Sequence, residues 1–243
     1  MTDGLSARQT QILKALIDEY IETAVPVGSE SLDKKYNLGI SPATIRNEMV
    51  NLTKAGYLRQ PHTSAGRLPT PVAMKFYIGQ LMEEKQMSLA DEVKAKEEIR
   101  GAGKDFDKLL TEITQTLAER TKNLALAATE EGKVWHAGYA NIFSNPEFAD
   151  LDICSGLFSF FEEAKLIHEL FFERSDFESP IEVLFGEELG WPELSPVGII
   201  TSHFKAGGKQ GALGVIGPIR LSYSTIIPTL KYFSNMIEEV VNG

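Results

Sequence analysis

Apolar side chains recur at helical spacing in the first part of the chain. Over residues 7–23 they fall three and four positions apart, which predicts an amphipathic helix facing a core on one side. Ser6 and Gln9 have the spacing of a capping box at the start of this helix. A shorter helix is expected over residues 30–36, with Ser29 as its N-cap.

A third helix is expected directly after the second. Ser41 is a good N-cap, the proline that follows it suits the first helical position, and Gly56 ends the helix near residue 55. Three helices with a tight glycine-containing turn between the second and third are typical of a helix-turn-helix unit. At 100° per residue, the buried side of the third helix carries Ile45, Met49 and Leu52.

The pattern changes to short strands after Gly56. Residues 57–62 and 68–70 are expected to pair as a hairpin around a polar turn, 63–67, with a basic tip. A hairpin after a helix-turn-helix makes a winged helix. A further helix, capped at Thr70, is expected to leave this domain near residue 85.

The remaining residues, 86–243, mix helices and strands. Helices are expected over 88–100, 106–117, 146–172 and 226–240, and strands over 124–128, 134–139, 181–186, 197–204 and 212–216. Helices that enclose a small antiparallel sheet give the α+β class. The domains are therefore placed at 1–85, a winged helix, and 86–243, an α+β domain with a helical connector.

Charge is distributed unevenly along the chain. The net charge is −10, yet residues 34–80 hold seven basic side chains and one acidic side chain, Glu48. A basic segment inside an acidic protein indicates a local surface for nucleic acid. The single cysteine rules out a disulfide framework, and the chain has neither an export signal nor a membrane-length apolar run, so a cytoplasmic protein without membrane contact is expected.

The outward face of the third helix suits the reading of base edges. It mixes small, hydroxyl, amide and guanidinium side chains, which match thymine methyl, adenine and guanine edges in a major groove. The recognition residues expected on it are Ser41, Ala43, Thr44, Arg46, Asn47 and Lys54. In an isolated helix such a face would be ordinary solvated surface, and the basic segment and the wing argue for DNA instead.

The wing and four further cations complete the expected DNA surface. The wing contributes His62, Thr63, Ser64, Gly66 and Arg67. Phosphate contacts are expected from Lys34, Lys35, Arg59 and Lys75.

Other candidate sites are weak. The glycines between 207 and 214 precede a strand, so they indicate a hairpin turn rather than a phosphate loop. The histidines have no metal-ligand spacing, acidic doublets such as Glu130–Glu131 suit a solvated surface, and Cys154 suits an apolar core. No catalytic constellation, metal or cofactor is expected.

Several segments resemble the bacterial heat-inducible transcription repressors of the HrcA family. The wing segment, Gln60-Pro-His-Thr-Ser-Ala-Gly-Arg-Leu-Pro-Thr, is the most specific match. Other matching segments are Leu5-Ser-Ala-Arg-Gln, Glu19-Tyr-Ile-Glu-Thr, Pro26-Val-Gly-Ser, Lys35-Tyr-Asn-Leu, Ser41-Pro-Ala-Thr-Ile-Arg-Asn-Glu-Met, Gly56-Tyr-Leu, residues 141–148, Gly207-Gly208 and residues 213–223.

The resemblance implies a non-enzymatic repressor of chaperone operons. Members of that family bind an inverted-repeat operator in double-stranded DNA as homodimers, are released on heat stress, and carry a GAF-like domain after the winged helix; a chaperonin partner is also implied. This chain is shorter than expected for the family, with the missing part placed between about residues 124 and 139. The GAF-like domain is therefore expected to be reduced.

Dimer contacts are expected from the C-terminal domain. Two helices there have apolar faces that could pair, and packing inside one subunit is the alternative. The residues on these faces are Phe106, Leu109, Ile113, Leu117, Ile226, Leu230 and Phe233. Two other functions stay open at this point: a regulator that binds a small molecule in its GAF-like domain, recognisable by a cavity inside the sheet, and an enzyme with an accessory winged helix.

Overall fold

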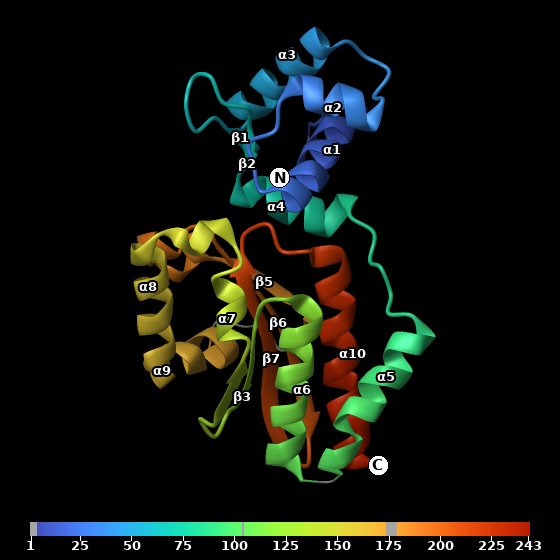
Figure 1. Cartoon of the computed structure of the whole chain (residues 1–243), viewed down its shortest axis with the longest axis vertical. Coiled ribbons are helices and arrows are strands. Elements are labelled where there is room, and N and C mark those ends of the chain that lie inside the picture. The colour runs from blue at the N-terminus through green and yellow to red at the C-terminus, as the bar shows by residue number, and fades with distance from the viewer. Residues whose placement is uncertain (1–3, 104, 174–178) are drawn as a thin grey trace. The chain divides into compact units, whose positions relative to one another are not determined.

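The computed structural model describes residues 4–103, 105–173 and 179–243. The chain divides into two compact units, Met1–Glu83 and Glu84–Gly243 (Figure 1). Helices and antiparallel strands occur in both, which confirms the predicted α+β class.

The first unit contains three helices, a two-stranded hairpin and a closing helix. In chain order its elements are α1 (Ala7–Thr23), α2 (Ser29–Tyr36), α3 (Pro42–Lys54), β1 (Leu58–Arg59), β2 (Leu68–Pro69), α4 (Pro71–Phe76) and a π-helical turn (Tyr77–Leu81). This order confirms the predicted winged helix-turn-helix. We call the first unit the winged unit.

Local capping sets most of the boundaries in the winged unit. The Ser6 and Gln9 capping box is present, and the side chains of Ser41 and Thr70 cap α3 and α4. The prediction for Ser29 was wrong, because this residue is the first of α2 and Gly28 holds the cap position without a side-chain hydrogen bond.

The wing is shorter than predicted. A strand was expected over residues 57–62, but only Leu58 and Arg59 pair, with Pro69 and Leu68 respectively. The amide of Tyr57 still bonds the carbonyl of Leu52 in α3, and Pro61 has no N–H to give to a ladder.

A single apolar core holds the winged unit together. Side chains from α1, α2 and α3 meet in it with no exposed surface, among them Leu13, Leu16, Leu32, Ile45 and Leu52. Each such side chain contributes about 1.5–3 kcal/mol by leaving water. The buried side of α3 is the one that the sequence predicts.

The second unit is a five-stranded antiparallel sheet with helices on both faces. Its helices are α5 (Leu89–Ile99), α6 (Phe106–Thr121), α7 (Tyr139–Ile142), α8 (Leu151–Glu162), α9 (Ala164–His168) and α10 (Tyr223–Asn242), with short 3₁₀ and π turns between some of them. Its strands are β3 (Leu124–Thr129), β4 (Val134–Ala137), β5 (Glu182–Phe185), β6 (Val197–Ala206) and β7 (Lys209–Pro218), in the sheet order β4-β3-β7-β6-β5. We call it the sheet unit.

The two faces of the sheet are covered by different helices. Helix α6 packs over β3 and β4, α10 packs over β6, and α5 lies against α6 (Figure 1). On the other face an apolar cluster joins β3, β6 and β7 to α7, α8 and α9. The ring of Phe171 lies so close over Gly214 that a Cβ there would be 2.7 Å from it. Packed side chains therefore fill the space between the sheet and these helices.

The prediction of one helix over residues 146–172 was wrong. Asp150 caps the start of α8 at Leu151, and the extended backbone of Glu163 separates α8 from α9. Phe148, in the 3₁₀ turn Pro146–Ala149 before α8, enters the same core as Phe160 and Phe171, whereas in one straight helix it would point about 120° away from Phe160.

Six of the seven residues predicted for dimer contacts belong to the interior of the sheet unit, and the seventh, Phe106, is half-buried. Leu109, Ile113, Leu117, Ile226, Leu230 and Phe233 are at most 2% exposed, and the Phe106 ring packs edge-on against that of Phe204. Their apolar faces are covered by the sheet and by each other, so the packing alternative describes them.

In the part of the chain that the structure describes, no helix is both long enough and apolar enough to cross a membrane.

Candidate nucleic-acid interface

Helix α3 is fixed at its start and along its inner side. The Ser41 hydroxyl accepts a hydrogen bond from the Thr44 amide at 3.2 Å and lies 3.0 Å from the Thr44 hydroxyl. Ile45, Met49 and Leu52 anchor the helix in the core, where none is more than 4% exposed. The orientation of the opposite face is therefore set by packing.

The outward face of α3 is open to solvent. Ala43, Arg46, Asn47 and Lys54 are exposed, and Thr44 is half-buried. Within the described residues, neither Arg46 nor Asn47 has a hydrogen bond or an ion pair to another side chain. Their donors and acceptors are free for a ligand, as the reading of base edges requires.

The one acidic residue of the basic segment is turned away from this face. Glu48 accepts hydrogen bonds from Gln9 at 3.1 Å and from Asn51 at 3.4 Å, and lies 3.8 Å from the Arg8 guanidinium. These contacts tie Glu48 to the start of α1. Its carboxylate is thus partly neutralised within the protein, which lowers its repulsion of a polyanion.

The wing is held in shape by backbone and amide contacts. The Gln60 side chain donates to the carbonyls of Thr63 at 2.9 Å and Ala65 at 3.0 Å. Val27 and Arg67 exchange two backbone hydrogen bonds, at 2.9 and 2.8 Å, which attach the wing to the loop between α1 and α2. Neither Gln60 nor Val27 was among the residues predicted from the sequence. Gln60 acts within its own hairpin, on residues three and five positions away. Val27 contacts a residue forty positions away, which no local pattern announces.

Gly66 is required by the closeness of that attachment. A Cβ at this position would lie 2.4 Å from the Val27 carbonyl oxygen. His62, Thr63 and Ser64, by contrast, are exposed at the turn of the wing. Three of the five predicted wing residues are thus exposed, and Gly66 has a structural role.

The sequence predicts Arg67 at the tip of the wing, but the structure places it elsewhere. It begins the return of the hairpin, is half-buried, and donates from Nε to the Thr53 hydroxyl on α3 at 3.1 Å. The wing and the recognition helix are therefore joined by a side-chain contact.

The cations predicted for phosphate contacts are in different environments. Lys35 forms ion pairs with Glu19 at 2.7 Å and Glu22 at 2.6 Å, and these carboxylates raise the pKa of Lys35 well above its ordinary value. Lys34 and Arg59 are exposed, and the described chain holds no ion pair to either. We therefore leave Lys35 out of the phosphate contacts proposed below.

The remaining candidate residues are structural. The Cys154 thiol is 5% exposed, and burial raises its pKa. The Gly207–Gly208 pair is the turn between β6 and β7, which confirms the predicted hairpin. Nowhere among the described residues do three histidine, cysteine or acidic side chains gather as a metal site would need.

The fold and this interface define a winged helix-turn-helix protein with an appended α+β unit. Residues 72–227 match the family described as "HrcA protein C terminal domain", which is more than half of the chain. The chain belongs to the HrcA family, as the resemblance implied.

Full-length relatives carry the same family name. The protein named "Heat-inducible transcription repressor HrcA" from Carboxydothermus hydrogenoformans is 26% identical, over 98% of this chain and 99% of its own length. The one from Geobacter sulfurreducens is also 26% identical, over the whole of both chains. A crystal structure titled as a hypothetical protein matches the fold with a TM-score of 0.77 at 19% identity, covering 98% of this chain and 99% of the other.

This chain is a short member of the family. The alignment with the C. hydrogenoformans protein runs over 340 positions, whereas the chain has 243 residues. About a hundred positions of the relative therefore have no counterpart here. At residues 124–139, where the sequence analysis placed the missing part, strands β3 and β4 are joined by a tight hairpin.

Proposed function

We propose that this protein is a DNA-binding transcription repressor of heat-inducible chaperone genes, released from its operator on heat stress. The observation that carries the proposal is the outward face of α3, where Arg46 and Asn47 are exposed and unpaired within the described chain, next to a wing tied to the same helix. The names of the full-length relatives support the repressor role.

In this proposal α3 enters the major groove. Asn47 and Arg46 contact base edges, while Ala43, Thr44 and Lys54 border them. The Ser41 end of the helix offers its first N–H groups to a phosphate. Specificity then rests on few side chains, and the rest of the surface supplies affinity.

The wing and nearby cations follow the sugar-phosphate backbone. His62, Thr63 and Ser64 contact it from the exposed turn, and Lys34, Arg59, Arg67 and Lys75 neutralise phosphates. Arg67 contacts a phosphate through the guanidinium N–H groups that its hydrogen bond to Thr53 does not use.

The operator is an inverted repeat read by a homodimer, and the sheet unit joins the two subunits. Residues 1–85 are the DNA-binding domain and residues 86–243 the dimerisation domain in this scheme. The filled core between the sheet and α7–α9 favours a structural role for the sheet unit over the binding of a small molecule there. A chaperonin partner, implied by the family, is part of the same proposal.

Selection of duplexes from a random pool by the intact protein provides the test. We expect a recovered consensus with two-fold symmetry, bound far more tightly than random DNA. Asn47→Ala should weaken binding to the consensus by about 1–3 kcal/mol and leave random DNA nearly unaffected. Asn51→Ala, on the same helix but with its amide bonded to Glu48, is the matched control and should change neither much. No enriched sequence, or an equal loss on both DNAs, would contradict base reading by Asn47.

A further inference from the structure

The segment that leads into α5 is extended and exposed. Residues 82–88 form neither a helix nor a strand. We call residues 84–87, Glu-Lys-Gln-Met, the strap. Three of its side chains are exposed and Met87 is half-buried, so apolar burial contributes little to its position. Polar contacts therefore have to hold it in place.

The strap is attached to α10 through a backbone hydrogen bond. It runs beside the first half of α10 (Figure 1), and the Lys85 amide donates to the Ser224 carbonyl at 2.7 Å. Pro228 lies inside α10, four residues after Ser224, and has no N–H to give to that carbonyl. The proline thus leaves an acceptor open on the helix, and the strap provides the donor.

An ion pair adds a second attachment next to the first. The Lys231 ammonium lies 2.6 Å from a carboxylate oxygen of Glu84. These side chains are 36% and 31% exposed, so water competes for the pair, and exposed ion pairs contribute little stability. The strap is therefore docked by two contacts that each release easily.

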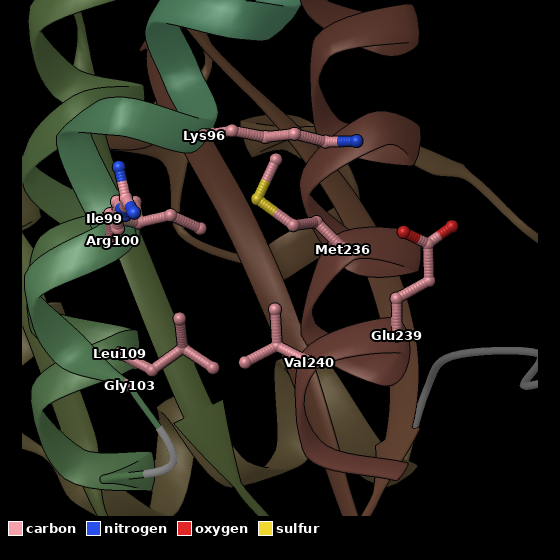
Figure 2. A pocket seen from close by; sticks show the side chains of 8 residues that line it. All are labelled: Lys96, Ile99, Arg100, Gly103, Leu109, Met236, Glu239 and Val240. Carbon is pink, nitrogen blue, oxygen red and sulfur yellow. The ribbon is translucent and has the colours of Figure 1, made fainter. Parts of the chain in front are cut away.

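Helix α10, by contrast, is firmly packed. Leu230 and Phe233 are 0% exposed. Further along, α10 borders a hollow of about 510 Å³ with α5 and α6, and Lys96 and Glu239 stand at its edge (Figure 2). Even there Met236 is only 3% exposed, so the helix is anchored beside the hollow as well. The helix stays in place when the strap leaves it.

The chain is also fixed on both sides of the strap. Before it, the Met82 amide donates to the Tyr77 carbonyl at 2.9 Å. After it, Ser88 caps α5, which packs against α6. Release from α10 would therefore free residues 83–87 and little else.

A released strap lengthens the tether between the two units of the chain. Five residues reach at most about 17 Å when fully extended. A longer tether lowers the effective concentration of a second binding unit at its site. Release also frees backbone torsions, so the released population grows with temperature.

We infer that the strap is a heat-sensitive latch. Docked on α10, it keeps the tether to the winged unit short; released on heating, it weakens binding to an operator with two half-sites. The inference rests on the proposed function and names a mechanism for the release of the operator. Weak contacts suit this role, because they open while both units remain folded.

Hydrogen–deuterium exchange of the intact protein tests whether the strap opens. Glu84→Lys places a like charge beside Lys231, and protection of the Lys85 amide should fall by about three- to tenfold. Combining Glu84→Lys with Lys231→Glu re-forms the pair in reverse and should restore the protection. Glu83→Lys is the matched control, because it makes the same charge change where the described chain holds no partner for the carboxylate.

Pro228→Ala tests the other attachment. Alanine brings back an N–H that competes with Lys85 for the Ser224 carbonyl, so protection of the Lys85 amide should fall by about fivefold. Pro71→Ala is the control, because Pro71 is at the start of α4, where a missing N–H frees no helical carbonyl. Far-ultraviolet circular dichroism checks that each variant is folded.

DNA binding tests the consequence of opening. The measured quantity is the affinity for a duplex with two half-sites divided by the affinity for a single half-site. This ratio should fall by about three- to tenfold when Glu84→Lys is combined with Pro228→Ala, and it should not change in Glu83→Lys. On heating, the wild-type ratio should fall to that of the double variant over the range in which the Lys85 amide loses protection.

Three results overturn the inference. Protection of the Lys85 amide is the same in Glu84→Lys and Glu83→Lys; the strap opens but the affinity ratio is unchanged; or the wild-type ratio falls on heating while Lys85 stays protected. If the wild-type protein prefers no DNA sequence at all, the proposed function fails and the role in operator release fails with it, whereas exchange still shows whether the strap opens.

Discussion

The Arg67 Nε atom donates a hydrogen bond to the Thr53 hydroxyl at 3.1 Å and joins the wing to the last turn of α3. The same Thr53 hydroxyl donates to the carbonyl of Met49 at 2.8 Å. One threonine thus links the helix that faces bases to the hairpin that faces phosphates, and the two parts of the interface keep a fixed spacing.

Replacing Thr53 by valine should uncouple the wing from α3. Valine has nearly the same shape but offers no acceptor to Arg67, so DNA affinity should fall by about 0.5–1.5 kcal/mol, the usual net value of one hydrogen bond. Fluorescence anisotropy with the selected duplex measures this loss. Thr111→Val, which removes a similar hydroxyl from α6, is the control. Equal affinities of Thr53→Val and wild type would show that the wing does not depend on this bond.

Gly66→Ala should disturb the wing more strongly. The added Cβ would lie 2.4 Å from the Val27 carbonyl oxygen, so the hairpin must move away from the loop that holds it. We expect a loss of about 1–3 kcal/mol in DNA affinity or in unfolding free energy. Gly79→Ala, where a Cβ meets nothing within 4 Å, should be neutral in both measurements. An unchanged Gly66→Ala protein would mean that the Val27 attachment is not needed.

The parts of the fold that were predicted correctly depend on neighbouring residues. Ser6, Ser41 and Thr70 cap helices within three positions of themselves, so their spacing in the sequence is enough to find the boundaries. The periodicity of α3 likewise identified both its buried and its exposed faces.

The parts that were missed depend on residues distant in the chain. Lys35 lies in a basic segment, but its partners Glu19 and Glu22 are on another helix. Arg67 was placed at a tip because nothing near it in the sequence reveals its contacts with Val27 and Thr53. The apolar stripes of α6 and α10 indicate burial, and periodicity cannot say whether a sheet or a second subunit provides it.

The winged unit should lose stability in alkaline solution because of Tyr77. Burial, and then the hydrogen bond that its hydroxyl donates to Asp18 at 2.6 Å, raise the pKa of Tyr77 well above its ordinary value of about 10. Above pH 10 the unfolded chain therefore releases this proton first, and the free energy of unfolding falls as pH rises further. Burial also raises the pKa of Tyr36 to about 12, which acts in the same direction.

Urea unfolding followed by circular dichroism between pH 8 and pH 11 measures this effect. Tyr77→Phe should be less stable than wild type at pH 8, since Asp18 loses a donor, and should fall less steeply above pH 10. Parallel curves for the two proteins would contradict a role for Tyr77 in the pH dependence. Tyr36→Phe should remove a separate share of the slope.

Two adjacent lysines give the most direct test of the electrostatic part of the interface. Lys34 is exposed with no ion pair in the described chain, whereas Lys35 is held by Glu19 and Glu22. If Lys34 neutralises a phosphate, Lys34→Ala removes one counterion-release step, and the slope of log affinity against log salt concentration should become shallower by about 0.9. Lys35→Ala deletes the same charge one position later and should leave that slope nearly unchanged, because its ammonium is already neutralised within the protein. Binding to random duplex DNA across a range of salt concentrations measures both slopes without requiring the operator. A larger change in Lys35→Ala than in Lys34→Ala would mean that the ion pairs with Glu19 and Glu22 open on binding and that Lys35 contacts the phosphate instead.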